Sequence, residues 1–318
     1  MQIKVIASTK VENNHQGYCK LDEWIKKKRR AELDVFINME ATGVYHEEAA
    51  YYLNRSGYLL SVVQPTKGKQ YAKSLDAKSK TDKIDARMLA QMGLERNLTL
   101  WKEPDSVLRK IKRLTRERIS LIRERNAITN QIHALKHEFD TSVETLKRHQ
   151  QRVALINEQL KAIELQLQEL VAEEKILSEK IKNVASIPGI SFITAVSVIS
   201  EADGFTNIEN VRHLVSYVGL DVVMKESGTL SWKPRISKRG NAYIRSALYF
   251  NAVCSIVHNK TISNYHQRLK EKGKKGKMAI IPLERKLLIW IYALYKNNAI
   301  FDEQYLQKKC SPTSAGLL

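Results

Sequence analysis

Residues 105–184 contain neither proline nor glycine, and apolar side chains recur along them in alternating steps of three and four. This heptad spacing is typical of helices that pack along a shared seam. The polar stretch near residues 140–150 predicts that the chain turns back there, so we expect an antiparallel coiled-coil hairpin over residues 101–183. The seam of its second helix consists of Val153, Ile156, Leu160, Ile163, Leu167, Leu170, Leu177, Ile181 and Val184.

The segments on either side of this hairpin have different patterns. Before it, the short apolar runs "IKVIAS", "LDVFINME" and "YLLSVVQP" predict strands, and segments with helical spacing lie between them, with a further helix from Thr81. Alternating strands and helices predict an α/β domain with a parallel or mixed sheet over residues 1–100. Residues 184–318 are punctuated by glycine and mostly of helical pattern. The expected fold class is therefore α/β plus mostly α.

The charge of the chain favours a polyanionic partner. Its net charge is +19, which points to nucleic acid or an acidic membrane surface, and a basic protein that binds RNA loosely fits as well. The longest apolar run, residues 287–295, is too short to span a bilayer, and the first residues lack the apolar core of a signal peptide. The three scattered cysteines form neither a disulfide framework nor a zinc pattern. We expect a cytoplasmic protein that binds nucleic acid and no membrane.

Two aspartates stand out within the basic segment "KSKTDKIDAR". Asp82 and Asp85 lie three residues apart, so on a helix their carboxylates share one face. Glu40 ends a predicted strand, where carboxylates of α/β sheets face the ligand crevice. Such oxygen ligands suit Mg²⁺ or Mn²⁺, and two ions can clamp the oxygens of a phosphodiester under cleavage. The ordinary alternative is that Asp82 caps the helix and Asp85 pairs with a neighbouring cation.

A second candidate region follows residue 220. Ser227 in "KESGTLSWKPR" could be a nucleophile if cations, a metal or another domain activated it, but a Ser-Gly pair in a loop is usually a turn. Basic and aromatic residues alternate just after it, which favours nucleic-acid contact over a solvated loop. The turn "IPGI" resembles that of a helix-hairpin-helix, where backbone N–H groups face a phosphate. The candidate cations are Lys233, Arg235, Lys238, Arg239 and Arg245, with Arg113 and Arg116 on the cationic first helix of the hairpin; a solvated helix face is the alternative for the last two.

Taken together, several motifs resemble one family. "INMEATGVYH", "KSKTDKIDAR", "VSYVGLDVVMKESG" and "ISKRGNAYIR" occur in the order found in the IS110 family of insertion-sequence transposases, the DEDD transposases. The resemblance implies a RuvC-like, ribonuclease-H-type domain over residues 1–100, a coiled coil over 101–183 and a C-terminal transposase domain over 184–318. It also implies that Glu40, Asp82 and Asp85 bind Mg²⁺ and that Ser227 attaches covalently to DNA.

The same resemblance implies partners. We expect DNA, both element ends and target, a structured non-coding guide RNA, and a homo-oligomer, dimer or tetramer, whose active sites combine acids of one subunit with the serine of another. A bacterial or archaeal chain of this kind would lie in the cytoplasm with the nucleoid.

One part of the family pattern is absent from this sequence. The family has four acids, the first on an opening strand, whereas no acidic residue precedes Glu12 here. We therefore expect a truncated RuvC-like domain whose sheet lacks its first strands, because Met1 is not the native start or because the element has decayed.

The sequence thus predicts a DNA recombinase of a mobile element that cleaves and rejoins strands with a serine nucleophile. Two alternatives remain open. A Holliday-junction-type nuclease would use the carboxylates and water alone, and a non-catalytic remnant would bind nucleic acid without cleaving it.

Overall fold

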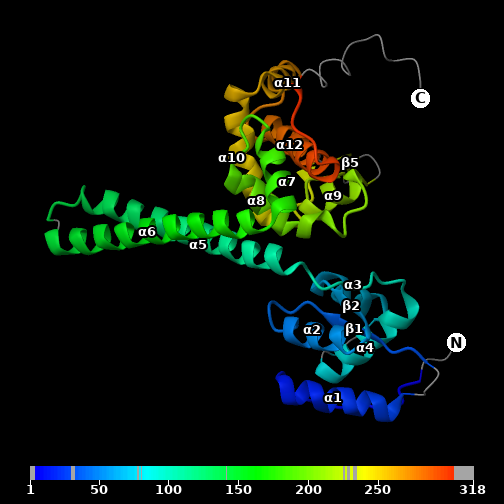
Figure 1. Ribbon diagram of the computed structural model, residues 1–318. Coiled ribbons are helices and arrows are strands. Elements are labelled where there is room, and N and C mark those ends of the chain that lie inside the picture. The colour runs from blue at the N-terminus through cyan, green and yellow to red at the C-terminus, as the bar shows by residue number, and fades with distance from the viewer. Residues whose placement is uncertain are drawn as a thin grey trace, which may run out of the picture. The chain divides into compact units, whose positions relative to one another are not determined.

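The computed structural model describes residues 4–29, 33–76, 79, 81–140, 142–224, 226–227, 230–231 and 235–303. The chain forms two compact units, Met1–Glu103 and Pro104–Leu318. Helices predominate in both, and the strands are short and paired in twos (Figure 1). Within the described residues, no helix is long and apolar enough to cross a membrane.

The first unit is built on two parallel strands. β1 (Phe36–Glu40) pairs with β2 (Leu59–Val63) from Phe36↔Leu59 to Glu40↔Val63. Parallel strands need a crossover, which α2 (Glu47–Arg55) supplies. The remaining helices are α1 (His15–Lys28), α3 (Pro65–Ser74) and α4 (Asp82–Glu95). These elements confirm the predicted strand–helix alternation over this part of the chain.

The predicted strand "IKVIAS" is wrong for its described residues. Residues 4–12 have no regular structure, and Val5 and Ile6 are exposed. A strand persists only where a neighbour completes its hydrogen-bond ladder, and β1 and β2 pair only with each other among the described residues. β1 is also half-buried along its whole length rather than buried. A two-stranded sheet does not establish a ribonuclease-H-type domain, so the RuvC-like assignment stays a prediction.

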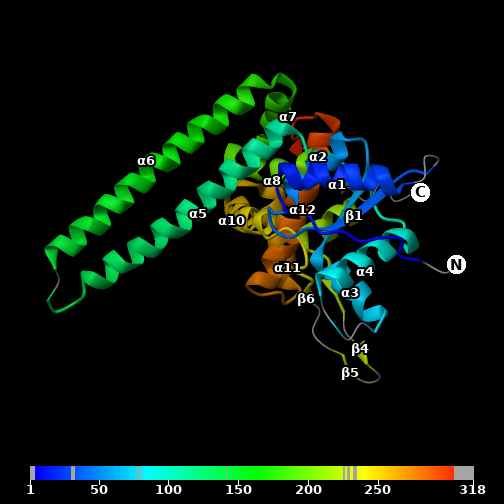
Figure 2. The same cartoon turned by 90° about the horizontal axis from the view of Figure 1, so that it is seen from below.

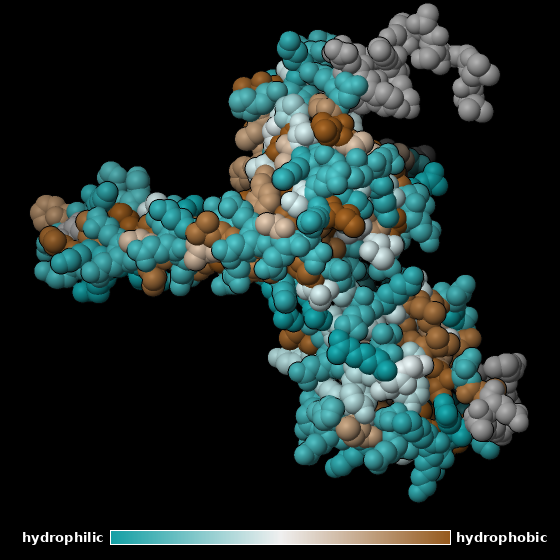
Figure 3. All heavy atoms as spheres, in the orientation of Figure 1, coloured by the Kyte–Doolittle hydropathy of each residue, from teal (hydrophilic) through white to brown (hydrophobic). Residues whose placement is uncertain are grey.

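Two long helices open the second unit. α5 (Ser106–Leu135) and α6 (Val143–Glu173) run side by side in opposite directions in both views (Figures 1 and 2). Ile128, Ile156 and Leu160 form a buried cluster between them. Ile156 and Leu160 belong to the seam predicted for the second helix. The face of the hairpin that Figure 3 shows is mostly hydrophilic. The antiparallel hairpin is therefore present, and its classification as a coiled coil stays a prediction.

The helices of the C-terminal part enclose the largest core. Phe205, Leu214 and Ile291 are fully buried there. Leu108 of α5 and Leu167 of α6 belong to the same core, so the base of the hairpin is packed into it. The helices are α7 (Lys175–Ala185), α8 (Phe192–Glu201), the 3₁₀ turn η1 (Asp203–Phe205), α9 (Val211–Val218), α10 (Ala242–His258), α11 (Lys260–Glu271) and α12 (Lys277–Asn297).

The "IPGI" turn between α7 and α8 has a packing role that the sequence did not show. Gly189 has φ +94°, and a β-carbon there would overlap the side chain of Ser255 in α10. Ser255 Oγ in turn donates to the Pro188 carbonyl oxygen at 3.3 Å. The glycine is thus required for close packing against α10, and this explains the motif without a phosphate.

Candidate active site

Glu40 is held at the carboxyl end of β1 by the pairing of the two strands. The next amide, Ala41 N, donates to the Val63 carbonyl oxygen at 2.8 Å, which continues the ladder past the strand. The half-buried Glu40 side chain extends over α3, where a β-carbon on Gly68 would lie 3.0 Å from Glu40 Oε2. Gly68 therefore leaves room for this carboxylate, a function that the sequence pattern around it did not reveal.

Asp82 and Asp85 lie in the first turn of α4. Thr81 caps this helix, because its Oγ1 accepts from Ile84 N at 3.3 Å. The alternative in which Asp82 caps the helix is thus wrong, although both acids also interact favourably with the helix dipole. Asp82 is exposed and Asp85 half-buried, so both remain accessible.

The packing of α4 on β1 brings these acids to the same end as Glu40. Asn38 Nδ2 of β1 donates to the Leu89 carbonyl oxygen of α4 at 2.8 Å. Glu40 follows Asn38 by two residues, which is about 7 Å along the strand, and Asp85 precedes Leu89 by four residues, which is about 6 Å along the helix. Gly93 of α4 lies against Phe36 at the other end of β1, so the helix runs antiparallel to the strand. Asp85 therefore lies toward the same end of β1 as Glu40.

The three acids do not form a metal site by themselves. Within the described residues, no group of three or more His, Cys, Asp or Glu side chains is arranged to hold a metal ion. The donors have the right chemistry for a hard cation, and two of them share an end of the unit, but they do not converge as three ligands. A metal site with Glu40, Asp82 and Asp85 as joint ligands therefore stays a prediction.

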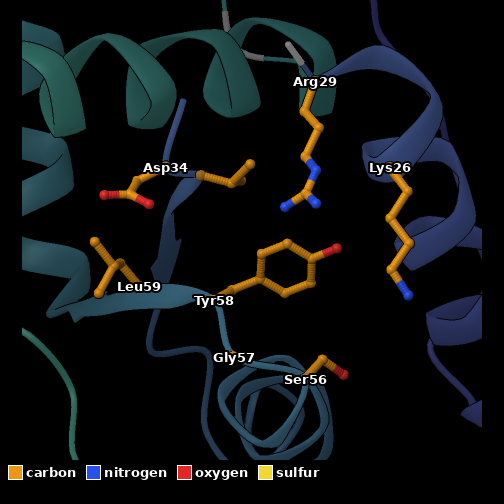
Figure 4. A pocket seen from close by; sticks show the side chains of 8 residues that line it. Lys26, Arg29, Asp34, Ser56, Gly57, Tyr58 and Leu59 are labelled. Atoms are coloured by element: carbon orange, nitrogen blue, oxygen red, sulfur yellow. The ribbon is translucent and has the colours of Figure 1, made fainter. Parts of the chain in front are cut away.

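A pocket of about 200 Å³ lies at the opposite end of the strands. Residues around the starts of β1 and β2 line it, and the Arg29 guanidinium and the Tyr58 ring face each other across it (Figure 4). Ligands of parallel α/β sheets bind at the carboxyl ends of the strands, which is the end with Glu40. The pocket is thus separate from the predicted site.

Ser227 lies in the second unit on a small ribbon. It ends β4 (Glu226–Ser227), which pairs antiparallel with β5 (Leu230–Ser231) in the register Ser227↔Leu230. Its side chain is exposed, and its hydroxyl forms no hydrogen bond with any other described residue. The serine thus stands at the end of β4, open to a large substrate, and among the described residues no base is hydrogen-bonded to it.

The cations predicted around Ser227 differ in their surroundings. Arg235 lies in β6 (Arg235–Ile236), which pairs with β3 (Val222–Val223), and it is exposed, as are Lys238 and Arg239. These three can reach a phosphate. Lys233 lies outside the described residues.

Arg245 and Arg116 have partners within the fold. Arg245 Nη1 donates to the Val218 carbonyl oxygen at 2.6 Å, at the end of α9. Arg116 Nε and Nη2 donate to the Glu201 carboxylate at 2.6 and 3.0 Å. Both arginines are thus bound within the fold, although the Arg116 side chain is still 43% exposed. Arg113 is exposed on α5 as well, and contact of these cations with nucleic acid stays a prediction.

Two further arginines of α5, Arg118 and Arg125, lie near the predicted seam and are likewise bound within the hairpin. Arg118 pairs with Glu164 of α6 at 2.7 Å, and Arg125 donates to Asn157 at 3.1 Å. Their position near the apolar seam is thus explained by hydrogen bonds across it.

Two family models of transposases match this chain. A family model of DEDD transposases, described as "Transposase", matches residues 2–139, and the model "Transposase IS116/IS110/IS902 family" matches residues 181–267. Together they match more than half of the chain.

Named proteins that resemble this chain rearrange DNA. It is 29% identical over 298 residues to the pilin gene-inverting protein of Moraxella bovis, covering 92% of this chain and 89% of the relative. It is 25% identical over 282 residues to the transposase for insertion sequence element IS1111A of Coxiella burnetii, covering 76% of each. The transposase for IS1328 of Yersinia enterocolitica is 25% identical over 246 residues, covering 70% of each.

Proposed function

We propose, on the premise that this chain belongs to the IS110 family of transposases, that it cleaves and rejoins DNA through Ser227 with help from the carboxylates of the first unit. As a transposase it is an enzyme that binds DNA. Among its relatives, one name specifies inversion of a gene and others the transposition of an element. Both processes cut DNA and join it again, which a serine that holds the cut end covalently would allow.

The observation that carries the serine assignment is the exposure of Ser227 at the end of β4, with Arg235, Lys238 and Arg239 exposed in the same region. A nucleophile that attacks a phosphodiester must be accessible to a duplex, and cations must stabilise the charge that builds up on phosphate oxygens. Attack by Ser227 Oγ on phosphorus would break the P–O bond to the leaving strand. The proton of the hydroxyl would pass to a base or water at the site.

For the first unit we propose a divalent cation site, with Mg²⁺ preferred and Mn²⁺ as an alternative. Glu40 and Asp85 share one end of the unit, and Asp82 stands in the same helix turn as Asp85. Mg²⁺ needs only one or two protein carboxylates when substrate phosphates and water complete its shell. When bound, it would polarise the phosphodiester oxygens.

The acids lie in one compact unit and the serine in the other. We propose a composite active site in a homodimer or tetramer, in which one subunit provides the acids and another the serine. A structured guide RNA is the second proposed partner, and exposed cations of α5 such as Arg113 are suited to its phosphates. An enzyme of this kind would work in the cytoplasm, at the nucleoid.

The serine assignment is tested by Ser227→Ala. We expect covalent protein–DNA adducts to disappear on denaturing gels, while RNA binding in a gel-shift assay stays within about twofold, because the change removes one exposed hydroxyl. Ser231→Ala, on the paired strand, is the matched control. Adducts that survive Ser227→Ala would place the nucleophile elsewhere. Cleavage that continues without any adduct would instead support a nuclease that uses carboxylates and water.

The cationic segment is tested by the salt dependence of DNA binding. Changing Arg235, Lys238 and Arg239 together to Gln should weaken binding to all sequences alike. For each phosphate that the variant no longer binds, the slope of log K against log salt should also fall by about 0.9. The triple change of Lys272, Lys274 and Lys275 to Gln, in the turn after α11, provides a control with the same charge. An unchanged slope in the first variant would show that the segment is solvated.

A further inference from the structure

Glu201 is a carboxylate whose position the proposed chemistry does not explain. It ends α8 and is only 2% exposed, and several polar groups around it bind its carboxylate. Arg116 of α5 donates to both of its oxygens, and Asn241 Nδ2 donates to Oε2 at 2.7 Å. Lys112 Nζ lies 3.9 Å from Oε2. A buried charge with these partners is costly to disturb, because removing one partner leaves the rest uncompensated.

An aromatic ring also contacts the Arg116 side chain and restricts its orientation. Its guanidinium lies 4.5 Å from the centre of the Tyr243 ring, in the first turn of α10. A planar guanidinium that stacks on a ring and binds a carboxylate through two N–H groups has a single orientation. The base of the hairpin is thereby connected to the start of α10.

Asn241 connects this cluster to the backbone of the preceding segment. Its Oδ1 accepts from Tyr243 N and Ile244 N at 2.9 and 3.1 Å and so caps α10. Its backbone N–H donates to the Tyr217 carbonyl oxygen at 2.9 Å, and Tyr217 Oη donates to the Glu201 carbonyl oxygen at 2.8 Å. These bonds form a closed network around Glu201.

From Asn241 the bonds continue to the cationic segment. A β-carbon on Gly240 would overlap the Tyr217 carbonyl oxygen and lie 2.6 Å from Gly219 N, so the two backbones cross in contact. Lys238 N donates to the Gly219 carbonyl oxygen at 3.1 Å, and Ser237 N donates to the Asp221 carbonyl oxygen at 2.9 Å. The strand pair β3–β6 begins at the next residues.

We propose that Glu201 is a positioning residue for recombination: through Arg116 and Asn241 it fixes the cationic segment Arg235–Arg239 relative to hairpin helix α5. This inference rests on the proposed function. Glu201 itself is buried and does not touch DNA, so its effect acts on the orientation of groups that do. A displacement of about 1 Å at such groups can lower a rate by up to about 100-fold.

The test compares Glu201→Gln with Glu164→Gln in the full-length protein. Glu164 also pairs with an arginine of α5, Arg118, but at a more exposed position on the hairpin. The first readout needs no DNA: in Glu201→Gln the amides of Lys238 and Asn241 should exchange hydrogen at least about tenfold faster. The control should leave them unchanged. Equal exchange in Glu201→Gln and the wild type would overturn the proposal.

The second readout is strand exchange between element-end and target DNA, with the element's RNA present. In Glu201→Gln the maximal rate at saturating DNA should fall at least about tenfold. The DNA concentration for half of that rate should stay within about twofold, because the phosphate-binding cations remain. A loss of apparent DNA affinity with an unchanged maximal rate, or the same loss of rate in Glu164→Gln, would overturn the positioning role.

A double variant separates positioning from mere stability. If Glu201 acts through Arg116, the losses of rate in Arg116→Met and Glu201→Gln should not add, so the double variant Arg116→Met/Glu201→Gln should be no slower than the slower single variant. The rates are compared at a temperature where all three variants are fully folded, and losses that add in full in the double variant contradict the proposal. If Ser227→Ala stays active, the proposed function fails, whereas the hydrogen-exchange result still decides the role of Glu201.

Discussion

Single carboxylates in this chain differ in whether the fold provides them with partners. Asp22 and Glu201 are buried and bound by several donors. Glu40 and Asp85, in contrast, are half-buried, and their side chains accept no hydrogen bond from other described residues. An acid with its own internal partners serves the fold, whereas an accessible acid without them is available to a ligand.

Asp22 allows a prediction about stability and pH. Its pKa is lowered by the hydrogen bond from Lys26 and then by that from Tyr58 Oη, at 2.5 Å. A lowered pKa stabilises the folded state above the unfolded value, near 3.9, and this contribution is lost as the pH falls through the folded value. Tyr58→Phe should therefore reduce the free energy of unfolding of the first unit by about 1–3 kcal/mol at neutral pH.

The measurement is urea unfolding of the full chain at several pH values. The difference between Tyr58→Phe and the wild type should shrink as the pH falls through the lowered pKa of folded Asp22. Tyr45→Phe, which alters an exposed ring, should have no effect. A difference independent of pH would show that Tyr58 acts by packing alone.

At the scale of elements, helix α3 was not predicted from the sequence pattern. Pro65 occupies its first turn, where proline is well tolerated, but Gly68 interrupts the helical pattern soon after. The pattern predicted a strand that ends at Pro65 and a helix only from Thr81, and it left the segment between them unassigned. The helix exists, and its glycine lies under the Glu40 carboxylate.

Gly68→Ala should separate stability from function. Alanine is favoured over glycine in a helix by about 1 kcal/mol, so the first unit should become slightly more stable. The new β-carbon would displace Glu40 Oε2, so DNA cleavage should slow at least about tenfold. Chemical denaturation and a cleavage assay measure the two effects, with Lys69→Ala as the control on the same helix. Full activity in Gly68→Ala would mean that Glu40 is not needed where it lies.

At the scale of the whole molecule, the two units have cores of very different size. The first encloses small groups of side chains around Val63, Tyr71 and Met92. The second has one continuous core that extends from α5 to α12. Since burial of apolar surface drives stability, the first unit should be the less stable.

Calorimetry of the full chain should therefore show two transitions, the first unit unfolding at the lower temperature. Tyr58→Phe should lower only the first transition. Leu214→Ala should lower only the second, by about 2–5 kcal/mol in free energy, because it leaves a cavity in the large core. A single transition shifted by both variants would show that the units unfold together.

The sequence by itself predicted β1, β2 and the helices α1, α2 and α4 around them, as well as the hairpin of α5 and α6, because periodicity and turn residues act locally. Its motifs also indicated the IS110 transposase family. The sequence also identified Glu40, Asp82, Asp85 and Ser227 as candidates, whose roles stay predictions. Only the tertiary structure decided which charges are bound within the fold. The cations of the α5 segment are alike in sequence, yet Arg116 meets Glu201 and Arg118 meets Glu164. Those partners lie far along the chain, and folding alone brings them into contact.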